Sequence, residues 1–226
     1  MLADRLTSAG MATRARRVAK ALAENLIPSS IAVWRGPSRP RRVALTFDDG
    51  PTDLTPEYLD LLDTVGARAT FFVVGDLCAQ RPSVLHDIAA RGHELAGHGF
   101  THRRFPLLAR EGLLDDELRR TAGLLPPHRT RRPLVRPPHG TMSAGSLRVV
   151  AAAGFTTVMW SLDSGDWRTT QPADVVNAVV GREVQPGSIV LFHDGQSWTV
   201  EALRTILLIL KGAGHELVTV GELLGR

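Results

Sequence analysis

The sequence has a single cysteine, Cys78, in 226 residues, so it holds neither an internal disulfide framework nor a cysteine-based zinc site. It has no run of 18 or more apolar residues, which excludes a spanning helix of the usual kind. The N-terminus lacks the basic start, apolar core and cleavage site of a secretory signal, so we expect a cytoplasmic or membrane-peripheral protein. Any metal ion must be held by histidine and carboxylate groups.

Positive charge is concentrated near the N-terminus. Residues 1–42 carry nine basic and two acidic residues, a net charge of +7, whereas the rest of the chain carries 18 basic and 21 acidic residues, a net charge of −3. We therefore predict a basic arm and linker at residues 1–41, with a loose helical pattern over 13–26, and a mildly acidic domain at residues 42–226. The arm is either a solvated helix or suited to weak contact with an anionic membrane surface. The acidic body argues against a nucleic-acid partner, and the sequence does not specify an oligomeric state.

Short apolar runs alternate with helical patterns from Val43 onward. The predicted strands are Val43–Phe47, Ala69–Val74, Glu94–Ala96, Leu134–Arg136, Thr156–Trp160, Ile189–Phe192 and Glu216–Val220. The predicted helices are Thr55–Thr64, Pro82–Arg91, Glu111–Leu124, Ala144–Ala153, Pro172–Gly181 and Val200–Lys211. Glycines at positions 66, 92, 154 and 214 follow helical patterns, where a helix stop is expected.

This alternation predicts an α/β fold with a parallel sheet wound by helices. About seven repeats in about 180 residues fit either a small barrel or an open doubly wound sheet, and periodicity does not separate the two. Both folds place their chemistry at the carboxyl ends of the strands. Reactive residues should therefore gather just after the predicted strand ends.

Two adjacent carboxylates, Asp48 and Asp49, follow the first predicted strand in the segment Thr46-Phe-Asp-Asp-Gly-Pro51. Their mutual repulsion requires a cation, and a metal ion is the obvious candidate. In a continuing strand the two side chains would face opposite ways, but the Gly-Pro step should break the strand and let both turn toward one site. The alternative is an Asp-Gly turn with solvated carboxylates.

Two histidines, His98 and His102, follow the third predicted strand. If this segment is helical, their i, i+4 spacing places them on one face, where they can bind one ion. One carboxylate would complete three protein ligands and leave a position for water, as catalytic zinc requires. We expect structural roles for four other histidines: His86, His93, His128 and His215.

Three further strand ends carry polar residues. In Arg136-Pro-Pro-His139, two prolines fix an arginine that would keep Asp48 ionised and oriented. Asp163-Ser-Gly-Asp166-Trp167 offers an aromatic wall for a sugar ring and a carboxylate that can orient an imidazole. His193 ends the apolar run Ile189–Phe192 on the same expected rim.

In this order, the motifs resemble those of the polysaccharide deacetylase family (carbohydrate esterase family 4, the NodB-homology domain) over about residues 42–224. Thr46–Pro51 matches the family's TFDDGP, and His98–His102 matches H-(S/T)-x-x-H except at its second residue. Arg136–His139 resembles R-x-P-Y with histidine in place of tyrosine, Asp163–Trp167 matches D-x-x-D-W, and Leu191–His193 matches L-x-H. The resemblance implies a single-domain distorted (β/α)7 barrel.

The resemblance also implies a reaction: hydrolytic removal of N-acetyl groups from amino sugars of a glycan of the chitooligosaccharide, peptidoglycan or exopolysaccharide type. By this similarity Asp49, His98 and His102 would bind a divalent metal, typically zinc. Asp48 would be the general base that activates water, held by Arg136.

The same similarity implies groups for the acid and substrate roles. His193 would protonate the leaving amine, with Asp166 holding its tautomer and charge. The backbone N–H of His139 would meet the developing oxyanion. Substrate contacts would come from His139, Pro138, Trp167 and Leu191.

Two departures from the family pattern have expected effects. Gly99 removes a hydroxyl that supports the histidine loop, so we expect slightly looser metal binding. The His139 side chain would change the pocket border and thereby substrate choice. Two alternatives keep the fold and the metal: a deacylase of O-acetyl esters or of another amide, and a non-catalytic sugar-binding module.

Overall fold

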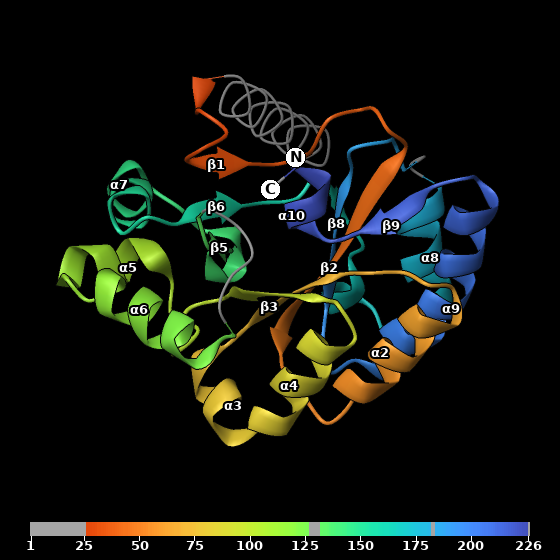
Figure 1. Cartoon of the computed structure of the whole chain (residues 1–226), viewed down its shortest axis with the longest axis horizontal. Helices are drawn as coiled ribbons and strands as arrows, with labels where there is room; N and C mark the ends of the chain where they lie inside the picture. The colour runs from red at the N-terminus through yellow and green to blue at the C-terminus, as the bar shows by residue number, and fades with distance from the viewer. Residues whose placement is uncertain (1–25, 127–131, 182–183, 226) are drawn as a thin grey trace, which may run out of the picture.

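The computed structural model describes residues 26–126, 132–181 and 184–225 (Figure 1). Most of the predicted basic arm, the helix predicted over 13–26 apart from its last residue, and His128 lie outside the described residues. Within the described ranges, no helix has both the length and the apolar character needed to cross a membrane.

A curled parallel sheet of nine strands forms the centre of the described chain (Figure 1). The strands run in the order β1-β6-β5-β4-β3-β2-β8-β7, with β9 also paired to β2, and every strand pair is parallel. Their bounds are β1 Ala32–Val33, β2 Arg42–Gly50, β3 Thr70–Val73, β4 Glu94–Gly97, β5 Leu134–Val135, β6 Thr156–Val158, β7 Leu162–Asp163, β8 Ile189–His193 and β9 Glu216–Val218. The predicted α/β fold, a distorted (β/α)7 barrel, is confirmed.

Helices surround this sheet (Figure 1). Their bounds are α2 Thr55–Thr64, α3 Gly75–Gln80, α4 Pro82–Ala90, α5 Phe105–Glu111, α6 Leu114–Leu124, α7 Ala144–Ala152, α8 Pro172–Val180, α9 Ser197–Gly212 and α10 Val220–Leu223. Two short 3-10 turns lie at Pro138–Gly140 and Asp166–Arg168. The glycines predicted to stop helices, at positions 66, 92, 154 and 214, all have positive φ, as a left-handed helix terminus requires.

Some element bounds differ from the prediction for local reasons. The helix predicted over Glu111–Leu124 is wrong at its start, because Gly112 takes φ 74° and ends α5 before α6 begins. The last strand was expected to reach Val220 but ends two residues earlier, because the Thr219 side chain accepts from the Glu222 N–H and caps α10.

Part of the predicted arm belongs to the sheet. Residues 32 and 33 form β1 and pair with β6, and the following Trp34 is buried. The N–H of Gly36 donates to the carbonyl of Gly187 at 2.8 Å. The linker predicted within residues 1–41 therefore contains a strand, and this strand is too short to show periodicity.

The alternating side chains of β2 separate the two faces of the sheet. Val43, Leu45 and Phe47 belong to the large apolar cluster that includes residues of α2, α4, α8 and α9. Ala44 lies in a different cluster, formed with residues of seven other strands. Thr46 and Asp48 share the face of Ala44, so the strand points polar groups into the barrel interior at its carboxyl end.

His93 makes folding stability depend on pH. Its Nδ1 accepts the Ala69 N–H at 3.2 Å, and its ring packs edge-on against Phe71. Burial lowers the pKa of His93 to about 4 from an ordinary value of 6.5. Between these two values the unfolded chain binds the proton more tightly than the folded chain, so stability is present above about pH 6.5 and is lost as the pH falls toward 4.

We therefore expect His93→Gln to flatten the loss of stability in mild acid. Relative to this variant, the wild-type protein should lose about 2 kcal/mol more unfolding free energy between pH 7 and pH 5. Urea unfolding at the two pH values measures this difference. The control is His86→Gln, at an exposed histidine on α4, which should retain the wild-type pH dependence. Equal pH dependence in all three proteins would show that His93 does not carry the effect.

Candidate active site

Asp48 and Asp49 lie at a bulge near the end of β2. The register with β3 shifts between Asp48 and Gly50, and Asp49 has φ 71°, in the left-handed region. The strand ends at Gly50, next to Pro51, as the Gly-Pro step predicts, but it extends beyond the predicted end at Phe47 and includes both carboxylates. Both carboxylates nevertheless approach one group: the Nε2 atom of His98 lies 3.8 Å from Asp48 Oδ2 and 3.3 Å from Asp49 Oδ1.

His98 and His102 meet at Asp49, although the segment between them is not helical. His98 follows β4 directly, and His102 has φ 56°, so a left-handed turn replaces the predicted helical face. The Nε2 atom of His102 lies 2.9 Å from Asp49 Oδ1. The ligand atoms of these three residues all lie within 4.8 Å of one another, a spacing that suits one metal ion.

The chemistry of these three side chains fits a cation. The Nδ1 atom of His98 lies 2.8 Å from the Arg136 carbonyl, which can only accept, so Nδ1 carries hydrogen and Nε2 is the ring atom that faces Asp49. Among the described residues, the buried Oδ1 atom of Asp49 has no hydrogen-bond partner. Burial raises the pKa of Asp49, but the adjoining His102 and His98 outweigh this and hold it well below its ordinary range. One carboxylate oxygen and two imidazole nitrogens gathered this closely form a donor set that suits a divalent cation.

Arg136 anchors Asp48 inside the barrel. Its guanidinium is fully buried and donates to Asp48 Oδ1 at 2.7 Å and to Thr46 Oγ1 at 2.8 Å. It also donates to the carbonyls of Val158 and Met159, each at 3.2 Å. The predicted contact between Arg136 and Asp48 is therefore present, and it fixes the carboxylate from below.

His193 and Asp166 form a second hydrogen-bonded pair, next to Asp48. His193 is the register partner of Asp48 on the neighbouring strand β8, and its Nδ1 lies 2.8 Å from Asp166 Oδ1. The fully buried Asp166 also accepts the His193 N–H at 2.7 Å and the Thr199 hydroxyl at 3.0 Å. Burial alone lowers the pKa of His193, but Asp166, together with Asp48 and Asp49, raises it to about 9.

The predicted substrate-contact residues occupy different positions around this centre. The His139 ring packs edge-on against His102, with centroids 4.7 Å apart, and burial and the charge of His102 lower the pKa of His139. Pro138 and Leu191 are buried, and Leu191 pairs in register with Thr46. Trp167 is 56% exposed and lies under the Arg168 guanidinium at the surface.

Backbone strain is concentrated at this site. Among the described residues, the non-glycine residues with positive φ are Asp49, His102 and His139. A left-handed L-residue costs roughly 1 kcal/mol and persists only where its surroundings fix it. At these three residues the backbone is strained, and the strain lowers stability while it directs the side chains toward the site.

The sequence interpretation missed two acidic residues behind the site. The buried Asp194 accepts the hydroxyls of Thr52 and Thr55 at 2.8 and 2.6 Å, and its N–H donates to the Asp48 carbonyl at 2.8 Å. A Cβ at Gly50 would collide with the Asp194 carboxylate, which accounts for the glycine there. The second is Glu117, whose only sequence signal is its place on the buried face of α6 beside Leu114 and Leu118.

Sequence comparison finds relatives over most of the chain. A sequence model described as polysaccharide deacetylase matches residues 35–158. A peptidoglycan-N-acetylglucosamine deacetylase of Bacillus cereus is 36% identical over 210 residues, which cover 90% of this chain and 97% of the relative. A chitooligosaccharide deacetylase of Sinorhizobium fredii is 39% identical over 156 residues, which cover 68% of this chain and 72% of the relative.

Solved structures show the same fold. The crystal structure of a peptidoglycan N-acetylglucosamine deacetylase in complex with 4-naphthalen-1-yl-N-oxidanyl-benzamide matches with a TM-score of 0.78 and 29% identity. The match covers 87% of this chain and 94% of that chain, so the likeness extends over most of both chains.

Replacing a metal ligand should remove metal without unfolding the protein. We expect Asp49→Gly and His102→Gly to lose bound zinc, while the metal-free melting temperature stays the same or rises, because glycine adopts positive φ freely. Equilibrium dialysis followed by metal analysis and a thermal melt measure the two effects. The exposed His86→Gly serves as the control for metal content. Stoichiometric zinc in either ligand variant would contradict the assignment.

Proposed function

The chain belongs to the polysaccharide deacetylase family, and we propose that it removes N-acetyl groups from amino sugars of a glycan with a bound divalent cation. The chain is accordingly a hydrolase of carbon–nitrogen bonds other than peptide bonds. The observation that carries the proposal is the convergence of one carboxylate oxygen and two imidazole nitrogens within 4.8 Å of one another. The names of the relatives specify peptidoglycan N-acetylglucosamine and chitooligosaccharide, and we propose a substrate of this class.

Asp49, His98 and His102 would hold the cation, and zinc suits two imidazoles and one carboxylate. When bound, such a cation acidifies water and polarises the acetamide carbonyl. The side chains of Asp49 and His102 are 41% and 31% exposed, so substrate and water can reach this side of the site. His98, at 2% exposure, closes it from within.

Asp48 would accept the proton of the attacking water. Its Oδ2 atom borders the ligand set at 3.8 Å from His98 Nε2, while Arg136 holds the other oxygen at 2.7 Å. One oxygen is thus fixed and the other faces the metal-ligand side, an arrangement that suits a general base. The backbone N–H of His139 would stabilise the developing oxyanion.

His193 would donate a proton to the departing amine. An amine leaves readily only when protonated, and the raised pKa of His193, about 9, keeps the ring in its donor form at neutral pH. The hydrogen bond from Nδ1 to Asp166 leaves Nε2 as the atom that transfers the proton.

The pocket for the acetyl group and sugar would use Pro138, Leu191 and Trp167, with the exposed Trp167 ring as a stacking surface. The His139 side chain lies beside His102 at the position where the family pattern has tyrosine. A neutral imidazole there is smaller than a phenol, so we propose that it changes which neighbouring sugar fits.

Acetate release from a substrate panel tests the proposed reaction. We expect release from N-acetylated chitooligosaccharide or peptidoglycan fragments, abolished by a chelator and restored by zinc. Asp48→Asn should keep zinc but lower turnover by at least about 100-fold. Release from acetylated xylan alone would indicate an O-acetyl esterase. The absence of release from any substrate with zinc bound would indicate a sugar-binding module.

The pH profile tests the acid role of His193. Activity should decline as the pH rises through the pKa of His193, which is about 9. A cation on Asp49 would offset one of the negative charges that raise this pKa, so the decline should be centred at or somewhat below pH 9. Asp166→Asn should lower activity and move the alkaline limb of kcat/KM by about one pH unit or more toward neutrality. The control is Asp163→Asn, at the end of β7, because the His193 hydrogen bonds go to Asp166. An alkaline limb that stays in place in Asp166→Asn would exclude His193 as the acid.

A further inference from the structure

The segment between the two histidines is held by a carboxylate from outside the site. Glu117, on the first turn of α6, is 5% exposed and accepts three hydrogen bonds. Its Oε2 atom accepts the N–H groups of Phe100 and Thr101 at 2.7 and 2.9 Å. Its Oε1 atom accepts the Thr101 hydroxyl at 2.7 Å. All three donors lie between His98 and His102 in the sequence.

The opposite side of the same segment is held by α3. The N–H groups of Gly75 and Asp76 donate to the carbonyls of Gly99 and Phe100 at 3.0 and 2.9 Å. The Arg120 guanidinium, one turn after Glu117 on α6, lies 3.7 Å from the centroid of the Phe100 ring. Residues 99–101 are therefore bonded through both their amides and their carbonyls.

This double attachment explains how the chain reverses at the second histidine. Gly99 has φ 78° and His102 has φ 56°, so a left-handed residue lies on each side of the held pair Phe100–Thr101. Glycine adopts this conformation freely, whereas histidine does so only with backbone strain. Strain of this kind persists only where neighbouring contacts fix the backbone. Thr101, which Glu117 binds at two atoms, directly precedes His102.

We propose that Glu117 is a positioning residue of the metal centre, which holds the 99–101 segment so that His102 turns toward Asp49. This inference rests on the proposed function, because it assigns Glu117 a purpose in metal binding. Gly99 lacks the hydroxyl of the family pattern, whereas the hydroxyl of Thr101, two residues later, donates to Glu117. Through this contact Glu117 would counteract the looser metal binding expected from Gly99.

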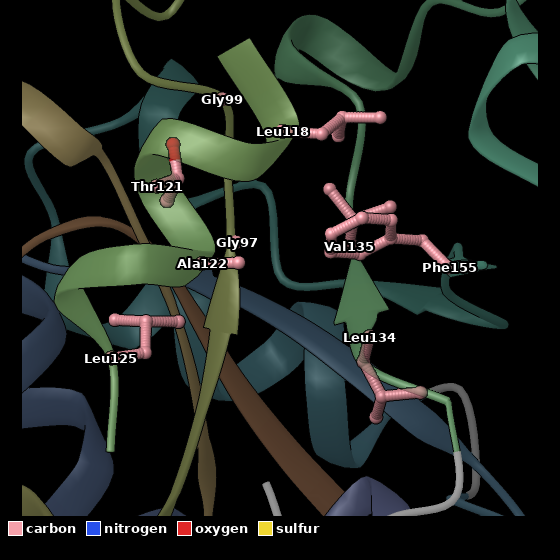
Figure 2. Close-up of a pocket in the computed structure, with 9 residues that line it drawn as sticks. All are labelled: Gly97, Gly99, Leu118, Thr121, Ala122, Leu125, Leu134, Val135 and Phe155. Carbon is pink, nitrogen blue, oxygen red and sulfur yellow. The ribbon is translucent and has the colours of Figure 1, made fainter. Parts of the chain in front are cut away.

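The same helix offers a control that affects packing alone. Leu118, Thr121 and Ala122 of α6 line a small, mostly apolar void of about 10 Å³, with Gly97 among the residues across it (Figure 2). Leu118 is buried in the cluster that α6 shares with α5 and α7. Gly99 also lines this void, but the hydrogen bonds to Phe100 and Thr101 come from Glu117, so Leu118→Ala should lower the melting temperature while leaving those bonds in place.

Zinc affinity, measured by competition with a chromogenic chelator, tests the proposal, with the metal-free melting temperature recorded for each variant. Glu117→Ala should weaken zinc binding about 10- to 100-fold, the usual effect of losing a group that holds a metal ligand in place. Glu117→Asp keeps the charge but is one methylene too short for all three donors, so it should weaken binding in the same direction.

Glu117→Gln should stay within about threefold of the wild type, because its carbonyl can accept both amides while its NH2 group donates to the Thr101 hydroxyl. Leu118→Ala should melt earlier yet bind zinc within about twofold of the wild type.

Three results would overturn the proposal. The first is wild-type zinc affinity in Glu117→Asp, and the second is a loss of zinc affinity in Leu118→Ala as large as in Glu117→Ala. The third is a Glu117→Gln variant that binds zinc as weakly as Glu117→Asp, which would assign the effect to charge alone. Glu117→Asp decides the matter if Glu117→Ala does not fold. A wild-type protein that binds no zinc and releases no acetate would instead refute the proposed function. The two failures are therefore distinguishable.

Discussion

The ion pair between Arg136 and Asp48 is the interaction on which the rest of the site depends. The guanidinium is fully buried in the barrel. It donates to the side chains of Asp48 and Thr46 and to two backbone carbonyls at the end of β6. Removing one partner of such a pair typically costs about 3–5 kcal/mol, because the other charge stays buried without compensation. The Arg136 carbonyl also sets the tautomer of His98. One residue thus fixes the proposed base and one proposed metal ligand together.

The geometry around this pair comes from backbone conformations that most sequences avoid. The bulge at Asp49 and the reversal at His102 turn a carboxylate and an imidazole toward each other from strands β2 and β4, which are not adjacent in the sheet. Contacts outside the site hold both turns: Asp194 binds the segment after Asp49, and Glu117 binds the segment before His102. The acidic groups behind the site therefore shape it without facing it.

Much of the fold and many of the candidate residues are predictable from the sequence, because parallel strands bring their carboxyl ends to one edge. The bounds of α2 match the prediction, since Pro56 in its first turn and the nearby Gly66 mark its ends locally. The two-residue strands β1 and β7 were not predicted, whereas the equally short β5 was predicted within Leu134–Arg136. The i, i+4 spacing of His98 and His102 indicated the right partners but the wrong conformation. Glu117 acts through main-chain amides about sixteen residues away, so its own surroundings in the sequence give no hint of its contacts.

The order of strands in the sheet constrains how the protein acquires its structure during synthesis. β2 is central and is made early, yet two of its three neighbours, β8 and β9, come from the last forty residues of the chain. The buried ion pair of Asp48 also forms only after Arg136, 88 residues later in the sequence, has been synthesised. Contacts of such long sequence separation slow folding and leave apolar strand surface uncovered in the meantime. A nascent chain that stops short of β8 would carry an unpaired strand edge, so the barrel can close only after β8 and β9 have been synthesised.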